Sequence, residues 1–281
     1  MRIEALVATM HQNDYSVLDS LNIQSDAVVI NQCDREGKHN FLYKNNNILW
    51  IDTKERGLSR SRNLALDNAT ADICVICDED ETLCDDYPQM IIDAFNSIPS
   101  ADIIVFNINR IGWNEKEKVF EKPHIVGKIK TYGSVHITFK LKPIKERLIR
   151  FDTKFGAGSG MYSCAEDAIF CMDCHKNKLN MYTYPGVLCD VRCDTSTWFA
   201  GYNEKYFFDV GAYLSVAFPR LKALMKWYYP IRCKKISRLS AFEIIHWINE
   251  GIKGYALNSN YETYLLNSKM REKKETSYEK Q

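Results

Sequence analysis

The sequence contains no apolar run of the length that a membrane-spanning helix requires, which is about 20 residues. In the C-terminal third the longest nearly uncharged stretch, residues 210–219, is much shorter than that. The N-terminus carries Arg2 and Glu4 and leads into a strand-like run, without the apolar segment of a signal peptide. We therefore expect a cytoplasmic protein.

Neither sign of charge is in excess. The chain has 37 Lys and Arg residues against 36 Asp and Glu, which gives a formal net charge of +1. A general nucleic-acid binder needs a surplus of basic residues to neutralise phosphates, so the composition argues against that class. The sequence also lacks internal repeats, and 281 residues suit one α/β domain with an appendage or two modest domains.

Cysteine, in contrast, is plentiful, with 10 residues. Cys171, Cys174 and His175 formally match a c-type haem attachment motif, and Cys189 and Cys193 could complete a zinc site. The sequence shows neither the small exported domain of a haem protein nor a compact zinc knuckle. We interpret the cysteines as reduced structural thiols, with a redox or metal protein built on them as the alternative.

Short apolar runs alternate with helical patterns over the first hundred residues. We expect strands at 3–9, 27–30, 48–51, 73–77 and 103–106, and helices at 58–68 and 87–95. This alternation predicts crossover connections and a mostly parallel sheet. In such sheets ligands bind at the carboxyl ends of the strands. Polar residues end or directly follow several of the expected strands, namely Thr9, Asn31, Gln32, Asp52 and Asp78.

Four consecutive acids, residues 78–81, follow the apolar run that ends at Cys77. Adjacent negative charges repel one another, so a cation or strong solvation must offset them. Carboxylates at the end of a buried strand suit a hard divalent cation, which prefers oxygen ligands. A solvated turn after a strand is the alternative interpretation.

A glycine-rich segment, residues 155–160, precedes a second pair of acids, Glu166 and Asp167, at the start of an expected helix. No Lys-Ser or Lys-Thr pair follows these glycines, so the segment is not a phosphate-binding P-loop. It is typical of a pliable loop near a ligand or of a simple turn. Acids at a helix start can also serve only as partners of the helix dipole.

The C-terminal third, from Tyr202 on, is rich in aromatic and basic residues. It predicts short amphipathic helices that either cover the sheet domain or lie on a membrane surface. The tail, residues 269–281, is highly charged, and we expect it to be disordered.

Three motifs in order resemble the family 2 glycosyltransferases of the GT-A fold. Residues 57–63 read G-L-S-R-S-R-N, similar to the family's G-x-S-x-(A/S)-R-N element; the acids at 78–81 resemble its D-x-D-type metal motif, and Gly158 with Glu166 and Asp167 resembles its downstream E-D pair. The resemblance covers roughly residues 1–200, and residues 196–220 are also similar to members that build bacterial surface polysaccharides. It implies an α/β, Rossmann-like GT-A fold with a mostly parallel sheet flanked by helices and a C-terminal helical appendage. The implied parts are a catalytic domain at 1–200, a helical region at 201–268 and the tail at 269–281.

The resemblance implies an inverting, metal-dependent transferase. A hexosyl or N-acetylhexosaminyl group would move from a nucleotide-sugar, with UDP as the expected nucleotide, to a glycan or lipid-linked saccharide. Asp80, with Asp78, would hold Mn²⁺ or Mg²⁺; Asp167 would be the catalytic base, and Glu166 its neighbour at the acceptor. The residues implied to border the nucleotide are Thr9, Met10, Asn31, Gln32, Arg62 and Asp78.

The chain departs from the family pattern at two places. Asn31 and Gln32 stand where acids are usual, and amides can still pair with a uracil edge. Many relatives have a His near the position of residues 192–193, where this chain has none, so Asp190, Arg192 or Asp194 could substitute, or the contact could be missing.

Two alternatives share the expected fold. A nucleotidyltransferase normally has a glycine-rich basic loop after the first strand, and residues 9–13 contain no glycine. A glycan- or nucleotide-binding module without turnover is the other alternative, against which the acids at 78, 80 and 167 count.

Overall fold

The computed structural model describes residues 1–281 except 113–118, 193–200 and 279–281, and it describes residues 271–278 by their backbone alone. The chain divides into two compact units. The first contains residues 1–153 and 166–196, and the second contains residues 154–165 and 197–281. The predicted boundary at residue 200 stays a prediction.

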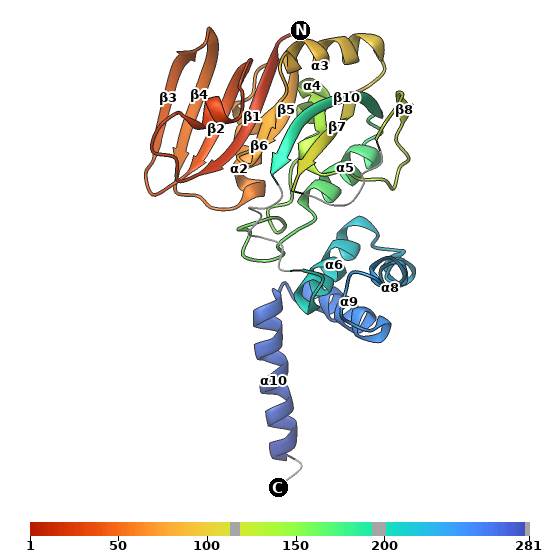
Figure 1. The fold of residues 1–281 in the computed structure, drawn as a ribbon. Coiled ribbons are helices and arrows are strands. Elements are labelled where there is room, and N and C mark those ends of the chain that lie inside the picture. The colour runs from red at the N-terminus through yellow and green to blue at the C-terminus, as the bar shows by residue number, and fades with distance from the viewer. Residues whose placement is uncertain (113–118, 193–200, 279–281) are drawn as a thin grey trace. The chain divides into compact units, whose positions relative to one another are not determined.

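The first unit is built on one ten-stranded sheet (Figure 1) with the order β3-β4-β2-β1-β5-β9-β7-β10-β6, and β8 pairs with β10 beside this path. Strands β4, β2, β1 and β5 are mutually parallel, and β7 and β10 run in the same direction because β9 is antiparallel to both β5 and β7. The expected mostly parallel α/β sheet is therefore confirmed. The strands are β1 (Ile3–Met10), β2 (Asp26–Gln32), β3 (Gly37–Tyr43), β4 (Asn46–Thr53), β5 (Ile73–Asp78), β6 (Glu81–Leu83), β7 (Ile103–Ile111), β8 (His124–Ile125), β9 (Ile137–Lys140) and β10 (Met181–Arg192).

Helices cover both faces of this sheet, and apolar residues fill both interfaces (Figure 1). Along β1, Val7 belongs to the core that includes α3, while Leu6 belongs to the core that includes α2 and α5. Because central strands are buried on both faces, their sequences are continuous apolar runs. The helices of this unit are α1 (Val17–Ser20), α2 (Leu58–Asn68), α3 (Tyr87–Ser97), α4 (Leu141–Glu146) and α5 (Glu166–Lys176), with a short 3₁₀ turn, η1 (Ser134–His136). Helices α2 and α5 therefore pack on the same face, which matters for the site below.

The second unit is helical, as expected for the C-terminal appendage. Its helices are α6 (Glu204–Ala217), α7 (Lys222–Met225), α8 (Tyr228–Cys233), α9 (Ala241–Ala256) and α10 (Tyr261–Tyr278). Helices α6 and α9 pack closely because Gly211 and Gly251 face each other's helix, where a Cβ would overlap the backbone carbonyls of Ile248 and Phe208. In the described part of the chain, no helix has the length and apolar character needed to cross a membrane.

Disorder of the C-terminal tail, residues 269–281, stays a prediction. Helix α10 continues to Tyr278, and residues 279–281 lie outside the described part of the chain. The segment is rich in Lys, Glu and Arg, which are well solvated and also have high helix propensity.

Candidate active site

Arg62, on α2, contacts carboxylates from two other elements. Its Nη2 lies 2.8 Å from Oδ2 of Asp78, the last residue of β5. Its Nη1 lies 3.2 Å from Oε1 of Glu166 and 3.2 Å from Oδ1 of Asp167, both in the first turn of α5. One guanidinium thus brings together residues from all three motifs that were recognised in the sequence.

The start of α2 directs Arg62 toward the sheet. Gly57 precedes the helix with φ of +119°, a conformation that residues with a Cβ rarely adopt, and its N–H donates to Oε1 of Gln32 at 2.7 Å. Helical spacing then puts Arg62 on the same face as the buried Ala65 and Leu66. The Arg62 side chain is consequently only 3% exposed.

Burial and charge oppose each other in this cluster. Burial alone would lower the pKa of Arg62, but the carboxylates of Asp78, Asp167 and Glu166 raise the pKa above its ordinary value. Burial raises the pKa of Asp78, and Arg62 works against this rise. Burial, followed by the Asp167 charge, raises the pKa of Glu166 well above its usual range. The cluster therefore has three carboxyl groups for one guanidinium, and burial beside one another favours the protonated form of Glu166 and Asp78.

Ser134, in η1, is a member of the cluster that sequence reasoning missed. Its Oγ accepts a hydrogen bond from Arg62 Nη2 at 2.7 Å, and its N–H donates to Oδ2 of Asp167 at 3.2 Å. Both Asp167 oxygens are therefore engaged, although the side chain keeps 25% exposure. No motif in the sequence distinguishes this serine.

The two glutamates among the four consecutive acids have structural contacts. Glu79 Oε2 accepts from Thr9 Oγ1 at 2.6 Å and from the Met10 N–H at 2.9 Å, which joins the ends of β5 and β1. Glu81 is 2% exposed, and its Oε1 accepts from the Asp78 N–H at 3.0 Å. Burial, with the nearby Asp78, raises the pKa of Glu81 well above its usual range.

Of the two aspartates of this segment, Asp78 contacts Arg62 directly, whereas no contact between the Asp80 carboxylate and Arg62 is found among the described residues. Asp80 is half-buried, and burial followed by the charge of Asp78 raises its pKa. Its backbone carbonyl accepts from the Arg192 N–H at 3.0 Å. Within the described residues, no three His, Cys, Asp or Glu side chains are grouped so that they could hold a metal ion by themselves.

The two amides at the end of β2 bond to the protein. Asn31 is completely buried; its Nδ2 donates to Asp52 Oδ1 at 2.7 Å and to the Gln12 carbonyl at 2.9 Å, and its Oδ1 accepts from the Gln12 N–H at 3.0 Å. Gln32 is also buried and holds Gly57 as described above. Direct contact of either amide with a base stays a prediction.

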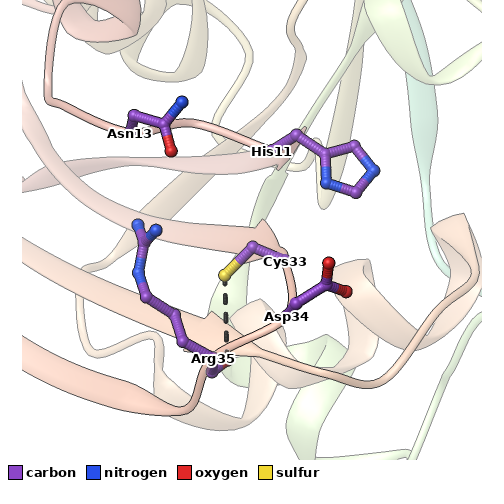
Figure 2. Close-up of a pocket in the computed structure, with 5 residues that line it drawn as sticks. All are labelled: His11, Asn13, Cys33, Asp34 and Arg35. Atoms are coloured by element: carbon purple, nitrogen blue, oxygen red, sulfur yellow. Dashed lines mark hydrogen bonds between the residues drawn. The ribbon is translucent and has the colours of Figure 1, made fainter.

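A cavity of about 430 Å³ opens at the carboxyl ends of β1 and β2 (Figure 2). It is lined by His11 and Asn13, which follow β1, and by Cys33, Asp34 and Arg35, which follow β2. Sequence reasoning noted that polar segments follow these strands but selected residues just before the ones that line the cavity. The cavity-lining residues could have been found from their position directly after the strands, because their residue types alone do not distinguish them.

The Arg35 side of the cavity is fixed by a buried acid. Arg35 Nε lies 2.6 Å from Oδ2 of Asp52, near the end of β4. Burial favours the neutral acid, but hydrogen bonds from Arg35, Trp50 and Asn31 lower the pKa of Asp52 to about 2. Asp52 therefore stays ionised at neutral pH and anchors the guanidinium.

The alternative contacts expected near residue 192 are described only in part. Asp190 Oδ1 accepts from Asn109 Nδ2 at 2.9 Å, on the β7–β10 pair. Residues 193 and 194 lie outside the described part of the chain.

The cysteines of the haem-like motif lie in the core. Cys171 and Cys174 are completely buried on α5. Burial raises the pKa of the Cys171 thiol to about 12 and that of Cys174 well above its usual range. Both thiols therefore pack as small apolar groups in the core.

Comparison with known proteins gives the same class as the fold and the ordered motifs. A family model described as glycosyl transferase family 2 matches residues 27–161. No curated protein sequence matches the chain. Among solved structures, residues 1–349 of TarS from S. aureus in complex with UDP-GlcNAc is similar, with a TM-score of 0.58, 13% identity and coverage of 93% of this chain and 77% of that chain.

The same TarS fragment in complex with UDP matches with a TM-score of 0.56 and 14% identity, and covers 93% of this chain and 76% of that chain. The molecule therefore has the GT-A fold. Within that class, residues 27–161 match the family 2 glycosyltransferases, which supports a glycosyltransferase.

Proposed function

We propose that this glycosyltransferase moves a sugar from a UDP-sugar to a hydroxyl of a saccharide acceptor, with inversion at the anomeric carbon. The observation that carries the proposal is the junction at Arg62, where Asp167 from the third motif lies beside Asp78 from the second. Transfer needs one carboxylate that accepts the proton of the acceptor hydroxyl and others that help to bind the diphosphate through a cation. This junction brings such carboxylates together.

The cavity at the ends of β1 and β2 supports nucleotide binding. Its position matches the rule that ligands of open α/β sheets bind beyond the carboxyl ends of the strands. The similar TarS fragment is a complex with UDP-GlcNAc in one structure and with UDP in another. We assign the base and ribose to the cavity lined by His11, Asn13 and Asp34. Thr9 and Met10, which precede His11 in the chain, would border the nucleotide.

Asp167 is the proposed base. Of the two acids on α5 it is the more exposed, with 25% of its side chain accessible against 9% for Glu166. As the acceptor oxygen bonds to the anomeric carbon, its proton would pass to Asp167 and the bond to the diphosphate would break. One base on the side opposite the leaving group gives inversion. Glu166, with its raised pKa, would remain a buried neighbour.

Asp80 and Asp78 would supply part of the ligands of a divalent cation, and the substrate would supply others. Arg62 offsets one charge among the carboxylates that it contacts, and Asp80 adds a further charge at the rim. Oxygen donors suit Mg²⁺ or Mn²⁺, and the remaining ligands would be water and substrate phosphates. Such a cation stabilises the charge that develops on the departing diphosphate. In this arrangement Arg62 organises the carboxylates and does not need to touch the nucleotide.

The proposed acceptor is a growing glycan or a lipid-linked saccharide of surface polysaccharide synthesis, handled in the cytoplasm at the inner membrane face. Support for this part comes from the resemblance of residues 196–220 to enzymes of that kind.

A donor screen tests the proposal. Nucleotide-sugars that carry UDP, GDP or CDP are added with Mn²⁺ and without it, and the melting temperature and the transfer to saccharide acceptors are measured. A UDP-sugar at 100 times its Kd stabilises the fold by about 2.7 kcal/mol, which is readily detected. We expect Asn13→Ala to reduce this shift, and Asn40→Ala, at an exposed position of β3, to preserve it. A shift with GDP- or CDP-sugars alone would contradict the UDP assignment.

A further inference from the structure

The second unit contains a long segment with charge of one sign. Between Asp209 and Glu243 the sequence has no acidic residue. The same segment has seven basic residues, which are Arg220, Lys222, Lys226, Arg232, Lys234, Lys235 and Arg238. The whole chain has a net charge of only +1, so this concentration of positive charge is local.

Helices α7 and α8 in this segment have one apolar side packed into the unit. Lys226 and Trp227, which join them, both have right-handed helical backbone angles, so helical periodicity continues across the junction. Met225, Tyr229 and Cys233, spaced four apart, belong to the core that α6 and α9 form. The apolar side chains on that side of the segment are therefore covered by the unit's own core.

A second apolar side of the same segment points away from the core. We call it the outer row: Leu221, Leu224, Trp227, Tyr228 and Ile231. Leu221, Leu224, Tyr228 and Ile231 recur at intervals of three or four residues, as on one face of a helix. Trp227 lies on the same face, three residues after Leu224 and four before Ile231. Leu224 is 69% exposed, Trp227 55% and Ile231 80%. Single exposed apolar side chains are common, but a row of them at helical spacing is a feature of interaction surfaces.

Positive charges lie directly beside the rings of the outer row. The Arg232 guanidinium lies 5.8 Å from the centre of the Tyr228 ring, and its Nη1 donates to the Tyr228 hydroxyl at 2.9 Å. Lys226 Nζ lies 5.9 Å from the centre of the Trp227 ring. Trp and Tyr next to Lys and Arg is the composition of protein surfaces at the boundary between lipid headgroups and acyl chains.

We propose that the outer row inserts into the headgroup region of an anionic lipid bilayer, with the surrounding Lys and Arg residues on the lipid phosphates. The positive charge of the segment distinguishes between the possible binding partners of the outer row. A second copy of this segment would bring seven like charges against seven, and a soluble polyanion would leave the apolar row unburied. An anionic bilayer satisfies both features at once. The inference does not depend on the proposed sugar transfer.

Co-sedimentation of the full chain with vesicles tests this surface. Phosphatidylcholine vesicles with about 30% phosphatidylglycerol are compared with pure phosphatidylcholine, at low and high salt. We expect binding to the anionic vesicles alone, weakened by salt. The apolar variant is Leu224→Ser with Trp227→Ser and Ile231→Ser, and the charge variant is Lys222→Glu with Lys234→Glu and Lys235→Glu. Each should weaken binding on the order of 100-fold.

Matched controls come from exposed positions of the first unit. Leu148→Ser and Lys142→Glu change residues that are comparably exposed, and both should bind as the wild type does. Equal binding of wild type and both triple variants would overturn the proposal. A dimer in sedimentation velocity that the triple variants abolish, without vesicle binding by the wild type, would also overturn it in favour of self-association. Asp167→Asn should bind vesicles normally, which separates this surface from catalysis.

Discussion

Arg62 Nη1 lies 3.2 Å from Oδ1 of Asp167, although the two residues are 105 positions apart in the sequence. The other terminal nitrogen of the same guanidinium holds Asp78. The arginine therefore fixes the distance between the proposed base and the strand end where the diphosphate is expected. Positioning of this kind contributes to rate through orientation as well as through charge.

Asp167→Asn should bind donor normally and transfer slowly. Asparagine keeps the size of the side chain but has one acceptor oxygen, so it can keep the hydrogen bond from Arg62 or the one from the Ser134 N–H, and it cannot take a proton. We expect kcat to fall by a factor on the order of 10² to 10⁴ with little change in donor affinity. Single-turnover rates and donor titrations measure the two quantities separately.

Glu166→Gln is the matched control on the same helix. Because Glu166 is buried, its replacement should reduce kcat far less than that of Asp167. An equal loss in both variants, or a loss of donor affinity in Asp167→Asn, would argue against a base at residue 167.

Arg62→Met should destabilise the protein. Removing the guanidinium leaves the buried Glu166 and the half-buried Asp78 without their counter-charge, and breaking a buried ion pair typically lowers the free energy of unfolding by about 3 to 5 kcal/mol. Urea denaturation measures this change. Arg60→Met, on the same helix at a partly exposed ion pair with Glu55, should lower the free energy of unfolding by about 1 kcal/mol or less. Equal effects of the two substitutions would show that Arg62 is not the centre of the cluster.

Local pattern predicted the parallel half of the sheet. The buried strands β1, β2, β4 and β5 are continuous apolar runs, and polar residues follow each of them. Strand β3, residues 37–43, was missed because it is mostly exposed and lacks such a run. The insertion of β9 between β5 and β7 was also missed, since strand pairing depends on distant parts of the chain.

For the site, order along the chain identified the motifs, and the structure adds how they meet. Arg62 was expected at the nucleotide, yet its contacts are with three acids, a network that no local spacing reveals. Ser134 belongs to no motif. It joins the cluster because the fold places η1 beside Arg62 and Asp167. Likewise, the different contacts of Glu79 and Glu81 follow from the turn between β5 and β6 and not from their residue type.

Glu81→Gln should change how stability depends on pH. In the folded protein the pKa of Glu81 is raised, so the folded state binds its proton more tightly than the unfolded state does. The wild-type free energy of unfolding therefore falls as pH rises from the unfolded pKa, about 4.5, toward the folded pKa. Glutamine cannot ionise and avoids this loss. Relative to wild type, the variant should gain up to about 1.4 kcal/mol per pH unit in that window.

Urea denaturation at pH 5, 6.5 and 8 measures this difference. Glu146→Gln, at an exposed position of α4, is the control and should follow the wild-type pH dependence. A constant difference between Glu81→Gln and wild type across the three pH values would contradict a buried, protonatable Glu81.

Asp80→Asn should separate metal binding from folding. Asp80 is half-buried, and its hydrogen bond with Arg192 uses the backbone carbonyl, so the amide can replace the carboxylate without loss of that bond. The amide keeps the shape but loses the negative charge that attracts a hard cation. We expect the Mn²⁺ concentration for half-maximal transfer to rise on the order of tenfold or more, and kcat to fall on the order of 100-fold.

Asp93→Asn, at a surface position of α3, is the control for a lost aspartate charge. The measurements are Mn²⁺ titrations of the transfer rate and of the melting-temperature shift that a UDP-sugar produces. Both should move together in Asp80→Asn, because the cation would join the carboxylate to the diphosphate. If the Mn²⁺ dependence of Asp80→Asn equals that of Asp93→Asn, the cation binds elsewhere and the β5 end serves only to hold Arg62.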